Sequence, residues 1–168
     1  QQPALESPKR VFFGVRKCDL NAIHKQDLVY LHDVRDPFYS ANRKNSTLIG
    51  YHCESAPSEM CFCGSMELKD YFDLQYYERG DNFLIEVGTE KGQALVAKHK
   101  KFFTEYHRTL SQEERKINHT DRLKKKDLKP WYNHKDWSKG VGLCLSCGAC
   151  TTLCPTCYCF EIHDEVKA

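Results

Sequence analysis

Residues 11–20 read VFFGVRKCDL, and this stretch decides the fold class of the chain. Its first half, Val11–Val15, is apolar and rich in Val and Phe, which predicts a short buried strand. Asp19 stands where the N-cap of a following helix is expected, and apolar residues then recur at partial helical spacing. A strand that runs directly into a helix is typical of an α/β protein.

The segments that follow extend this pattern. The Asp36-Pro37 pair suits a turn that opens a helix reaching Asn45. Ser46–His52 reads STLIGYH and predicts a second strand. Phe72–Tyr77 and Phe83–Val87 flank a turn that contains glycine, which predicts a hairpin. Together these elements predict an α/β (α+β) fold built on a small βαβ-like unit with a hairpin, and Thr89–Lys98 predicts the start of another helix.

Composition limits the classes of protein that the chain can belong to. It has 168 residues, is 40% hydrophobic and carries a formal net charge of +2, which excludes a collagen-like or wholly disordered protein. No apolar run approaches the roughly 20 residues that cross a bilayer, so we expect no membrane-spanning segment. Lys98–Asp136 is strongly basic, but no nucleic-acid-binding motif accompanies it, so nucleic acid is not expected as a partner.

Three domains are expected. The α/β domain covers residues 1–97, a basic helical connector covers 98–139, and a terminal module covers 140–168. The module is defined by six of the ten cysteines, which fall within sixteen residues, while the other four lie in the first 63 residues. Clustering of this kind suits a metal centre rather than a framework of disulfides, which usually staples distant loops.

Residues 144–155, CLSCGACTTLCP, form the most specific motif in the chain. Cys144, Cys147, Cys150 and Cys154 follow the bacterial ferredoxin pattern, in which closely spaced thiolates bind a [4Fe–4S] cluster. Gly148 lets the backbone pass close to the cluster. A structural zinc site usually has two Cys-x2-Cys pairs separated by a gap, and this continuous run has no such gap.

The same pattern leaves the first cluster one ligand short. In two-cluster ferredoxins the fourth cysteine binds the other cluster, so Cys154 would serve a second site. Either the chain continues beyond Ala168, which we favour, or Cys157 or Cys159 completes the first site. Both of these cysteines are possible ligands.

The first group of cysteines, Cys18, Cys53, Cys61 and Cys63, makes one set of four thiols. Cys18 and Cys53 each follow a predicted strand, at the end where α/β sheets place their ligands. Two parallel strands that end side by side would bring these two thiols together, and the Cys61-x-Cys63 loop would add two more. We expect a separate iron–sulfur cluster here, most simply [4Fe–4S], with zinc as the alternative because four thiolates also satisfy a structural zinc site.

Several motifs together resemble a known family. They are Val15–Leu20 (VRKCDL), Asp36–Tyr39 (DPFY), Cys61–Met66 (CFCGSM), Glu86–Gly92 (EVGTEKG) and the run that ends at Phe160. The sequence is similar to the iron–sulfur beta subunit of sulfhydrogenases and to the iron–sulfur subunit of anaerobic sulfite reductase, both dicluster [4Fe–4S] electron-transfer proteins. Family members are longer and carry a second ferredoxin run, so the resemblance implies that this chain is a fragment.

The resemblance implies a function that agrees with the cysteine pattern. Members of the family relay electrons between a flavin subunit that uses NAD(P)H and a catalytic hydrogenase, sulfur- or sulfite-reducing subunit. We therefore expect two or more [4Fe–4S] clusters, an electron-transfer role within an oxidoreductase complex rather than the catalytic role, and a reducing, cytoplasmic compartment. The alternative is a structural zinc-binding interaction module.

Overall fold

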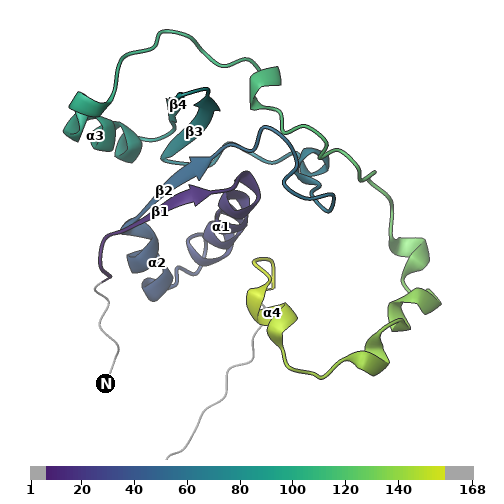
Figure 1. Cartoon of the computed structure of the whole chain (residues 1–168). Coiled ribbons are helices and arrows are strands. Elements are labelled where there is room, and N and C mark those ends of the chain that lie inside the picture. The colour runs from purple at the N-terminus through teal and green to yellow at the C-terminus, as the bar shows by residue number, and fades with distance from the viewer. Residues whose placement is uncertain (1–6, 158–168) are drawn as a thin grey trace, which may run out of the picture. The chain divides into compact units, whose positions relative to one another are not determined.

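The computed structural model describes residues 7–157, which divide after Lys125 into two compact units. The first unit is built on four strands: β1 (Arg10–Val15), β2 (Ser46–Tyr51), β3 (Leu74–Arg79) and β4 (Asn82–Val87). They form one sheet in the order β1-β2-β3-β4, in which the first three strands are parallel and β4 is antiparallel to β3 (Figure 1). The predicted α/β class and hairpin are confirmed.

Helices join these strands and cover the sheet. Helices α1 (Lys17–Tyr30) and α2 (Pro37–Lys44) connect β1 to β2, so the predicted βαβ unit contains two helices. They lie on one side of the sheet, and α3 (Glu90–Lys98) follows the hairpin (Figure 1). The Asp36 side chain caps α2 by accepting a hydrogen bond from the Tyr39 amide, as the Asp-Pro signal predicted.

A buried carboxylate joins α1 to α2. The hydroxyl of Tyr39 donates to Asp27 at 2.6 Å, and the Nε of Arg43 donates to the same carboxylate at 2.9 Å. Tyr71, which precedes β3, also donates its hydroxyl to Asp27. Because this one charged group receives two donors from α2 and one from the segment before β3, these contacts fix the helix pair against the chain that leads into β3.

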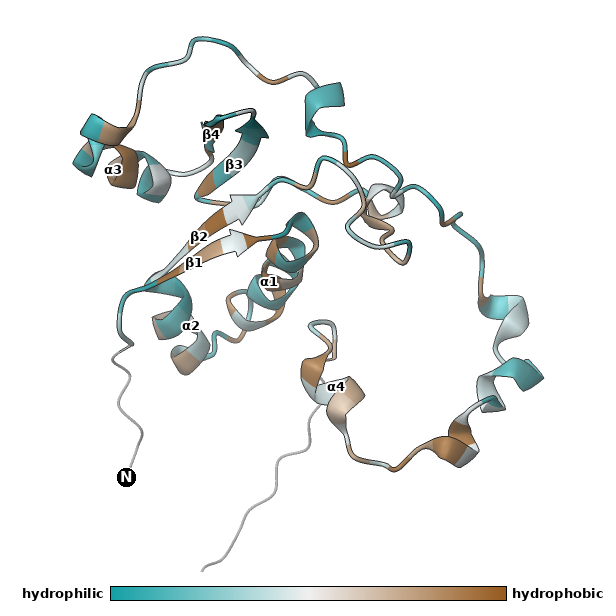
Figure 2. Cartoon of the chain, in the orientation of Figure 1, coloured by the Kyte–Doolittle hydropathy of each residue, from teal (hydrophilic) through white to brown (hydrophobic). Residues whose placement is uncertain are grey.

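The core lies between the sheet and α1. Leu20, Leu48 and Leu74 are almost fully buried, and Gly50 lies so close to Leu20 that an added Cβ would be 3.0 Å from it. The apolar residues of β1 and β2 stand out in Figure 2. The core is small, so polar contacts carry much of the remaining packing.

Two expectations for the first strand and helix are wrong. Strand β1 is not buried: Val11, Phe12 and Phe13 are 59%, 45% and 67% exposed, because β1 lies at the edge of the sheet. Helix α1 begins at Lys17 with Arg16 as its N-cap, which places Asp19 inside the first turn rather than at the cap. An acidic residue there still complements the positive end of the helix dipole.

The basic segment also differs from expectation. The sequence predicts surface helices in the basic connector, residues 98–139. In the part of it that belongs to the first unit, the structure instead has two 3-10 turns, Lys100–Phe102 and Glu113–Arg115, joined by irregular chain. Leu110, Ile117 and Thr120 are nevertheless buried in the first unit.

The second unit begins at Lys126. Its described part contains three 3-10 turns, Lys129–Trp131, Lys135–Ser138 and Val141–Leu143, and the short helix α4 (Ala149–Leu153). The predicted domain boundaries at residues 97 and 139 stay predictions.

Candidate metal centres

The first group of cysteines gathers beyond the carboxyl ends of β1 and β2. Cys18 lies in the first turn of α1, directly after β1, and Cys53 lies two residues beyond β2. Because β1 and β2 pair in parallel, both strands end at the same edge of the sheet, as the sequence predicted. Cys61 and Cys63 lie in the long connection from β2 to β3, where Cys63 opens a 3-10 turn.

A bulge at the end of β1 precedes this site. The strand register shifts between Phe13 and Val15, and the intervening Gly14 has a φ of +77°. Bulges bend a strand and redirect the side chains that follow. The side chain of Arg16 then reaches across to the β2 side of the site, where its Nη1 donates to the Cys53 Sγ at 2.8 Å.

In this site the pKa values of Arg16, Cys18 and Cys63 are shifted by their neighbours. The pKa of Arg16 is raised by the hydrogen bond to Cys53, and the charges of Cys53, Cys18 and Cys61 act in the same direction. Burial, then the charges of Asp19 and Cys63, raises the pKa of Cys18 to about 11. Burial and the charge of Cys61 raise the pKa of Cys63, while a hydrogen bond with Cys18 opposes them. All four cysteines therefore belong to one electrostatic neighbourhood, in which metal binding would displace thiol protons.

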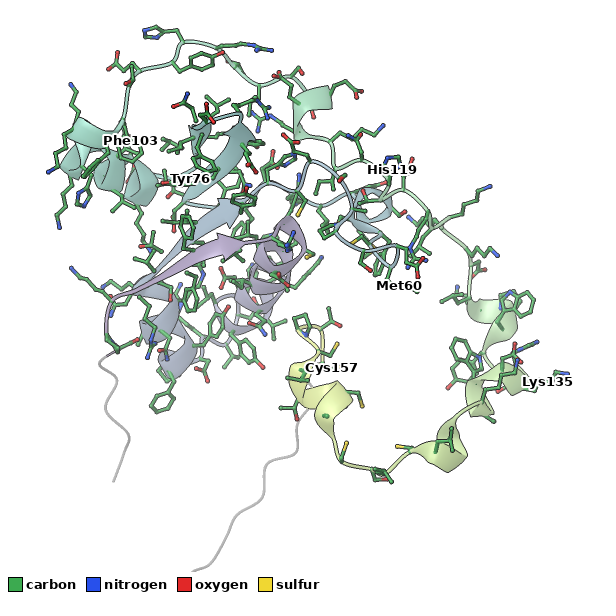
Figure 3. The ribbon with its side chains drawn as sticks, viewed as in Figure 1. Met60, Tyr76, Phe103, His119, Lys135 and Cys157 are labelled. Carbon is green, nitrogen blue, oxygen red and sulfur yellow. The ribbon has the colours of Figure 1, made fainter. Side chains whose placement is uncertain are left out.

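A distant segment, residues 117–123, clamps the loop that carries Cys61 and Cys63. The buried hydroxyl of Thr120 accepts from the Gly64 amide at 3.0 Å and donates to the Ile117 carbonyl at 2.6 Å. Arg122 donates to the carbonyls of Met60 and Cys61 at 2.8 Å and 3.1 Å. The loop and the clamp lie side by side near the labelled Met60 and His119 in Figure 3.

The clamp was not predicted from the sequence. Thr120 and Arg122 lie in a basic segment whose charge predicts only a surface role. No spacing in the sequence links them to a loop that lies more than fifty residues earlier. The glycine of the CFCGSM motif offered a partial signal, because a Cβ at Gly64 would lie 2.8 Å from the Thr120 hydroxyl.

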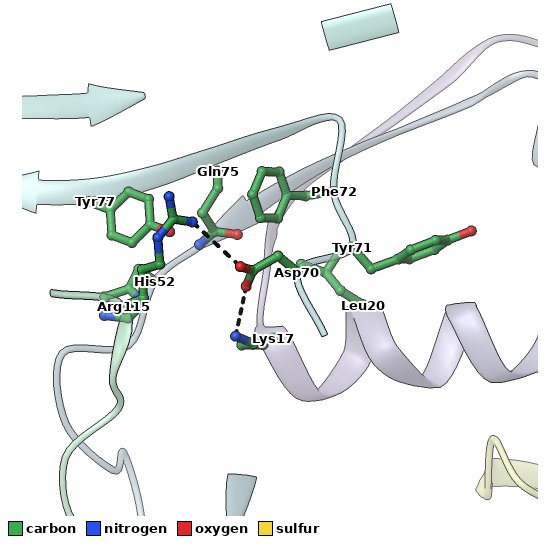
Figure 4. Close-up of a pocket in the computed structure, with 9 residues that line it drawn as sticks. All are labelled: Lys17, Leu20, His52, Asp70, Tyr71, Phe72, Gln75, Tyr77 and Arg115. Atoms are coloured by element: carbon green, nitrogen blue, oxygen red, sulfur yellow. Dashed lines mark hydrogen bonds and ion pairs between the residues drawn. The ribbon is translucent and has the colours of Figure 1, made fainter. Parts of the chain in front are cut away.

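Polar contacts also fix the first turn of α1. Lys17 pairs with Asp70 at 2.7 Å, and Asp70 pairs with Arg115 at 3.5 Å beside a small pocket (Figure 4). The buried Asn21 side chain donates to the carbonyls of Lys17 and Lys69 and accepts from the Lys69 amide. The turn that carries Cys18 is thereby fastened to the segment that leads into β3.

The donor chemistry of the first site fits a thiolate-bound metal centre. Four thiols and one guanidinium are available, and iron–sulfur clusters and structural zinc both bind through four cysteines. Within residues 7–157, no three Cys, His, Asp or Glu side chains are arranged to hold a metal ion as they stand. A metal centre at Cys18, Cys53, Cys61 and Cys63 would therefore need this site to rearrange.

The ferredoxin run occupies the end of the described second unit. Ser146 and Gly148 have φ angles of +52° and +71°, so the backbone curls between Cys144 and Cys150. The Ser146 amide points to the Cys144 Sγ at 3.4 Å, which is the kind of amide–sulfur contact that supports a cluster. Cys150 lies in α4, and Cys154 is the first residue after this helix.

Two further cysteines border the run. A hydrogen bond from Thr156, followed by one from Cys157, lowers the pKa of Cys154 to about 7. The Cys157 amide donates to the Cys154 carbonyl at 3.1 Å. Cys159 lies outside the described residues, so the possible ligand roles of Cys157 and Cys159 stay predictions.

Two comparisons with known proteins find similarity, one to the terminal segment and one to most of the chain. Residues 143–168 match the family model described as a 4Fe-4S dicluster domain. Over 93% of its length, the chain is 34% identical to sulfhydrogenase 2 subunit beta of Pyrococcus furiosus. The chain is a relative of the sulfhydrogenase beta subunit. It spans about half the length of that protein (50%), and no solved structure matches it.

The similarity to the sulfhydrogenase beta subunit confirms the resemblance seen in the sequence. The matched segment contains the terminal cysteines, and the match supports [4Fe–4S] clusters as the class of cofactor for this region. The similarity also extends over the first unit, which the dicluster match does not cover. In the part of the chain that the structure describes, no helix is both long and apolar enough to cross a membrane.

Proposed function

We propose that the chain is an iron–sulfur electron-transfer part of an oxidoreductase complex, and that it holds at least two [4Fe–4S] clusters. One cluster is bound by Cys18, Cys53, Cys61 and Cys63. Another is bound by Cys144, Cys147 and Cys150, while Cys154 serves a neighbouring cluster. The single observation that carries the proposal is the ferredoxin run inside a segment that matches a 4Fe-4S dicluster domain.

The two regions differ in the side chains that surround their cysteines. A bound [4Fe–4S] cluster supplies one-electron redox chemistry. In the first unit, Arg16, Thr120 and Arg122 hold the cysteine loop and the Cys53 thiol in place. In the second unit, large apolar side chains flank the cysteines; Leu143, Leu145 and Leu153 are each more than four-fifths exposed. If they packed over a bound cluster, such apolar side chains would limit the access of water to it.

The partners follow from the relative. Its name identifies it as one chain of a sulfhydrogenase, so we propose that this chain also works in a complex with a catalytic hydrogenase, sulfur- or sulfite-reducing subunit. A flavin subunit that uses NAD(P)H is proposed as the other electron partner. A reducing compartment such as the cytoplasm suits a protein whose thiols must stay available for metal.

Purification of the complete protein without oxygen tests the proposal. We expect a brown protein whose broad absorption near about 400 nm bleaches on reduction, with iron and acid-labile sulfide in equal amounts. A colourless protein that contains zinc and little iron would contradict the proposal and favour a structural zinc module. Identification of the subunits that co-purify tests the proposed partners separately.

A further inference from the structure

Arg16 is the charged side chain that contacts a thiol directly in the first site. Its Nη1 lies 2.8 Å from the Cys53 Sγ, within the range of a charge-assisted hydrogen bond to a thiolate. The neighbouring Lys17 is engaged elsewhere, because its ammonium lies 2.7 Å from the Asp70 carboxylate. Of these two adjacent cations, Arg16 is therefore the one whose charge acts on the cysteines.

The backbone explains why Arg16 occupies this position. It follows the Gly14 bulge and is the N-cap of α1, so it lies between the end of β1 and the turn that carries Cys18. Cys53 follows the adjacent parallel strand. The Arg16 side chain therefore reaches from the end of β1 to Cys53, and its planar guanidinium donates a hydrogen bond to the Cys53 thiol.

We propose that Arg16 is a positioning and potential-setting residue for the cluster at Cys18, Cys53, Cys61 and Cys63. This inference rests on the proposed function, because it requires a cluster at that site. Uptake of one electron adds one negative charge to the cluster and its thiolates, with no bond broken and no proton required. A guanidinium hydrogen-bonded to one of those thiolates stabilises the reduced form, and it therefore raises the reduction potential.

Three variants of the complete protein, purified without oxygen, test this role. Arg16→Gln removes the charge, whereas Arg16→Lys keeps the charge but not the planar donor. Arg35→Gln is the matched control, because it removes the same charge from an exposed residue beyond the other end of α1. The readout is a reductive titration followed by electron paramagnetic resonance of the signal that Cys61→Ser abolishes.

The expected change lies in the potential of that signal. Arg16→Gln shifts the reduction equilibrium toward the oxidised form by about tenfold, which is about 59 mV for a one-electron couple. Arg16→Lys gives a smaller shift in the same direction, and Arg35→Gln leaves the potential unchanged. Iron content is measured in parallel, to separate the charge effect from loss of the cluster.

The outcomes distinguish this inference from the proposed function. A fully iron-loaded Arg16→Gln protein whose potential equals that of Arg35→Gln overturns the role of Arg16 but leaves the cluster in place. If Arg16→Gln loses its iron, the Arg16→Lys protein decides. A reduction potential below that of the wild type supports the role of Arg16, and an unchanged reduction potential overturns it. An iron content that Cys61→Ser does not change overturns the cluster at the first site and with it the role of Arg16, but it leaves the proposed cluster at the ferredoxin run standing.

Discussion

Replacing Thr120 by Val tests whether the clamp holds the cysteine loop. Thr120 is 1% exposed, and its hydroxyl joins the Gly64 amide to the Ile117 carbonyl at 3.0 Å and 2.6 Å. Valine has nearly the same shape but no hydroxyl, so Thr120→Val removes both hydrogen bonds while keeping the volume. The close approach of Gly64 to the hydroxyl leaves little room for a water molecule to replace it.

The expected loss of stability follows from those two contacts. A buried backbone group left without its hydrogen-bond partner costs about 1–3 kcal/mol, so we expect the free energy of unfolding to fall by about 2 kcal/mol. With a urea slope of about 2 kcal/mol per molar, the unfolding midpoint falls by about 1 M. Thr109→Val is the matched control, because Thr109 is exposed and its replacement should move the midpoint little.

Urea unfolding of the two variants, followed by circular dichroism, checks this prediction. Iron content should also fall in Thr120→Val, because the loop that positions Cys61 and Cys63 loses an anchor. Equal midpoints for Thr120→Val and Thr109→Val would mean that the Thr120 hydroxyl does not fasten the loop.

Two further substitutions test other parts of the account. Gly14→Ala adds a Cβ that meets no atom within 4 Å, but it strains a backbone at φ +77°. Thermal unfolding should therefore show a stability lower by about 1 kcal/mol. An unchanged melting temperature would contradict the left-handed conformation of Gly14 in the bulge. Asp27→Asn leaves the half-buried Arg43 without its charged partner, so the free energy of unfolding measured in urea should fall by about 3 kcal/mol. Asp33→Asn, at an exposed aspartate, is the control. An effect of Asp27→Asn no larger than that of the control would mean that the Asp27 carboxylate does not hold α1 and α2 together.

Local patterns predicted most of the sheet. The Asp-Pro signal, the Gly-containing turn and the strand-like runs each reflect short-range chemistry, and the corresponding α2, hairpin and strands are present. The burial of β1 was predicted wrongly, because an apolar run does not reveal whether its strand lies at the centre or at the edge of a sheet. That position depends on the strand order, which is a property of the whole fold.

The candidate site was predictable only in part. The strand-end rule placed Cys18 and Cys53 after the ends of two neighbouring parallel strands, and the structure confirms that pairing of the strands. The contribution of Thr120 and Arg122 could not be predicted, because their hydrogen bonds join segments separated by more than fifty residues and follow no sequence period. Contacts of this kind arise from how an irregular segment packs, and local propensity does not encode them.

The iron content of paired cysteine variants shows whether the chain holds two separate clusters. The complete protein is purified without oxygen as wild type, as Cys61→Ser/Cys63→Ser and as Cys144→Ser/Cys147→Ser, and iron and sulfide are counted per chain. We predict that each double variant loses about four iron atoms and keeps the iron of the other site. Unchanged iron in Cys61→Ser/Cys63→Ser would contradict a cluster at the first site.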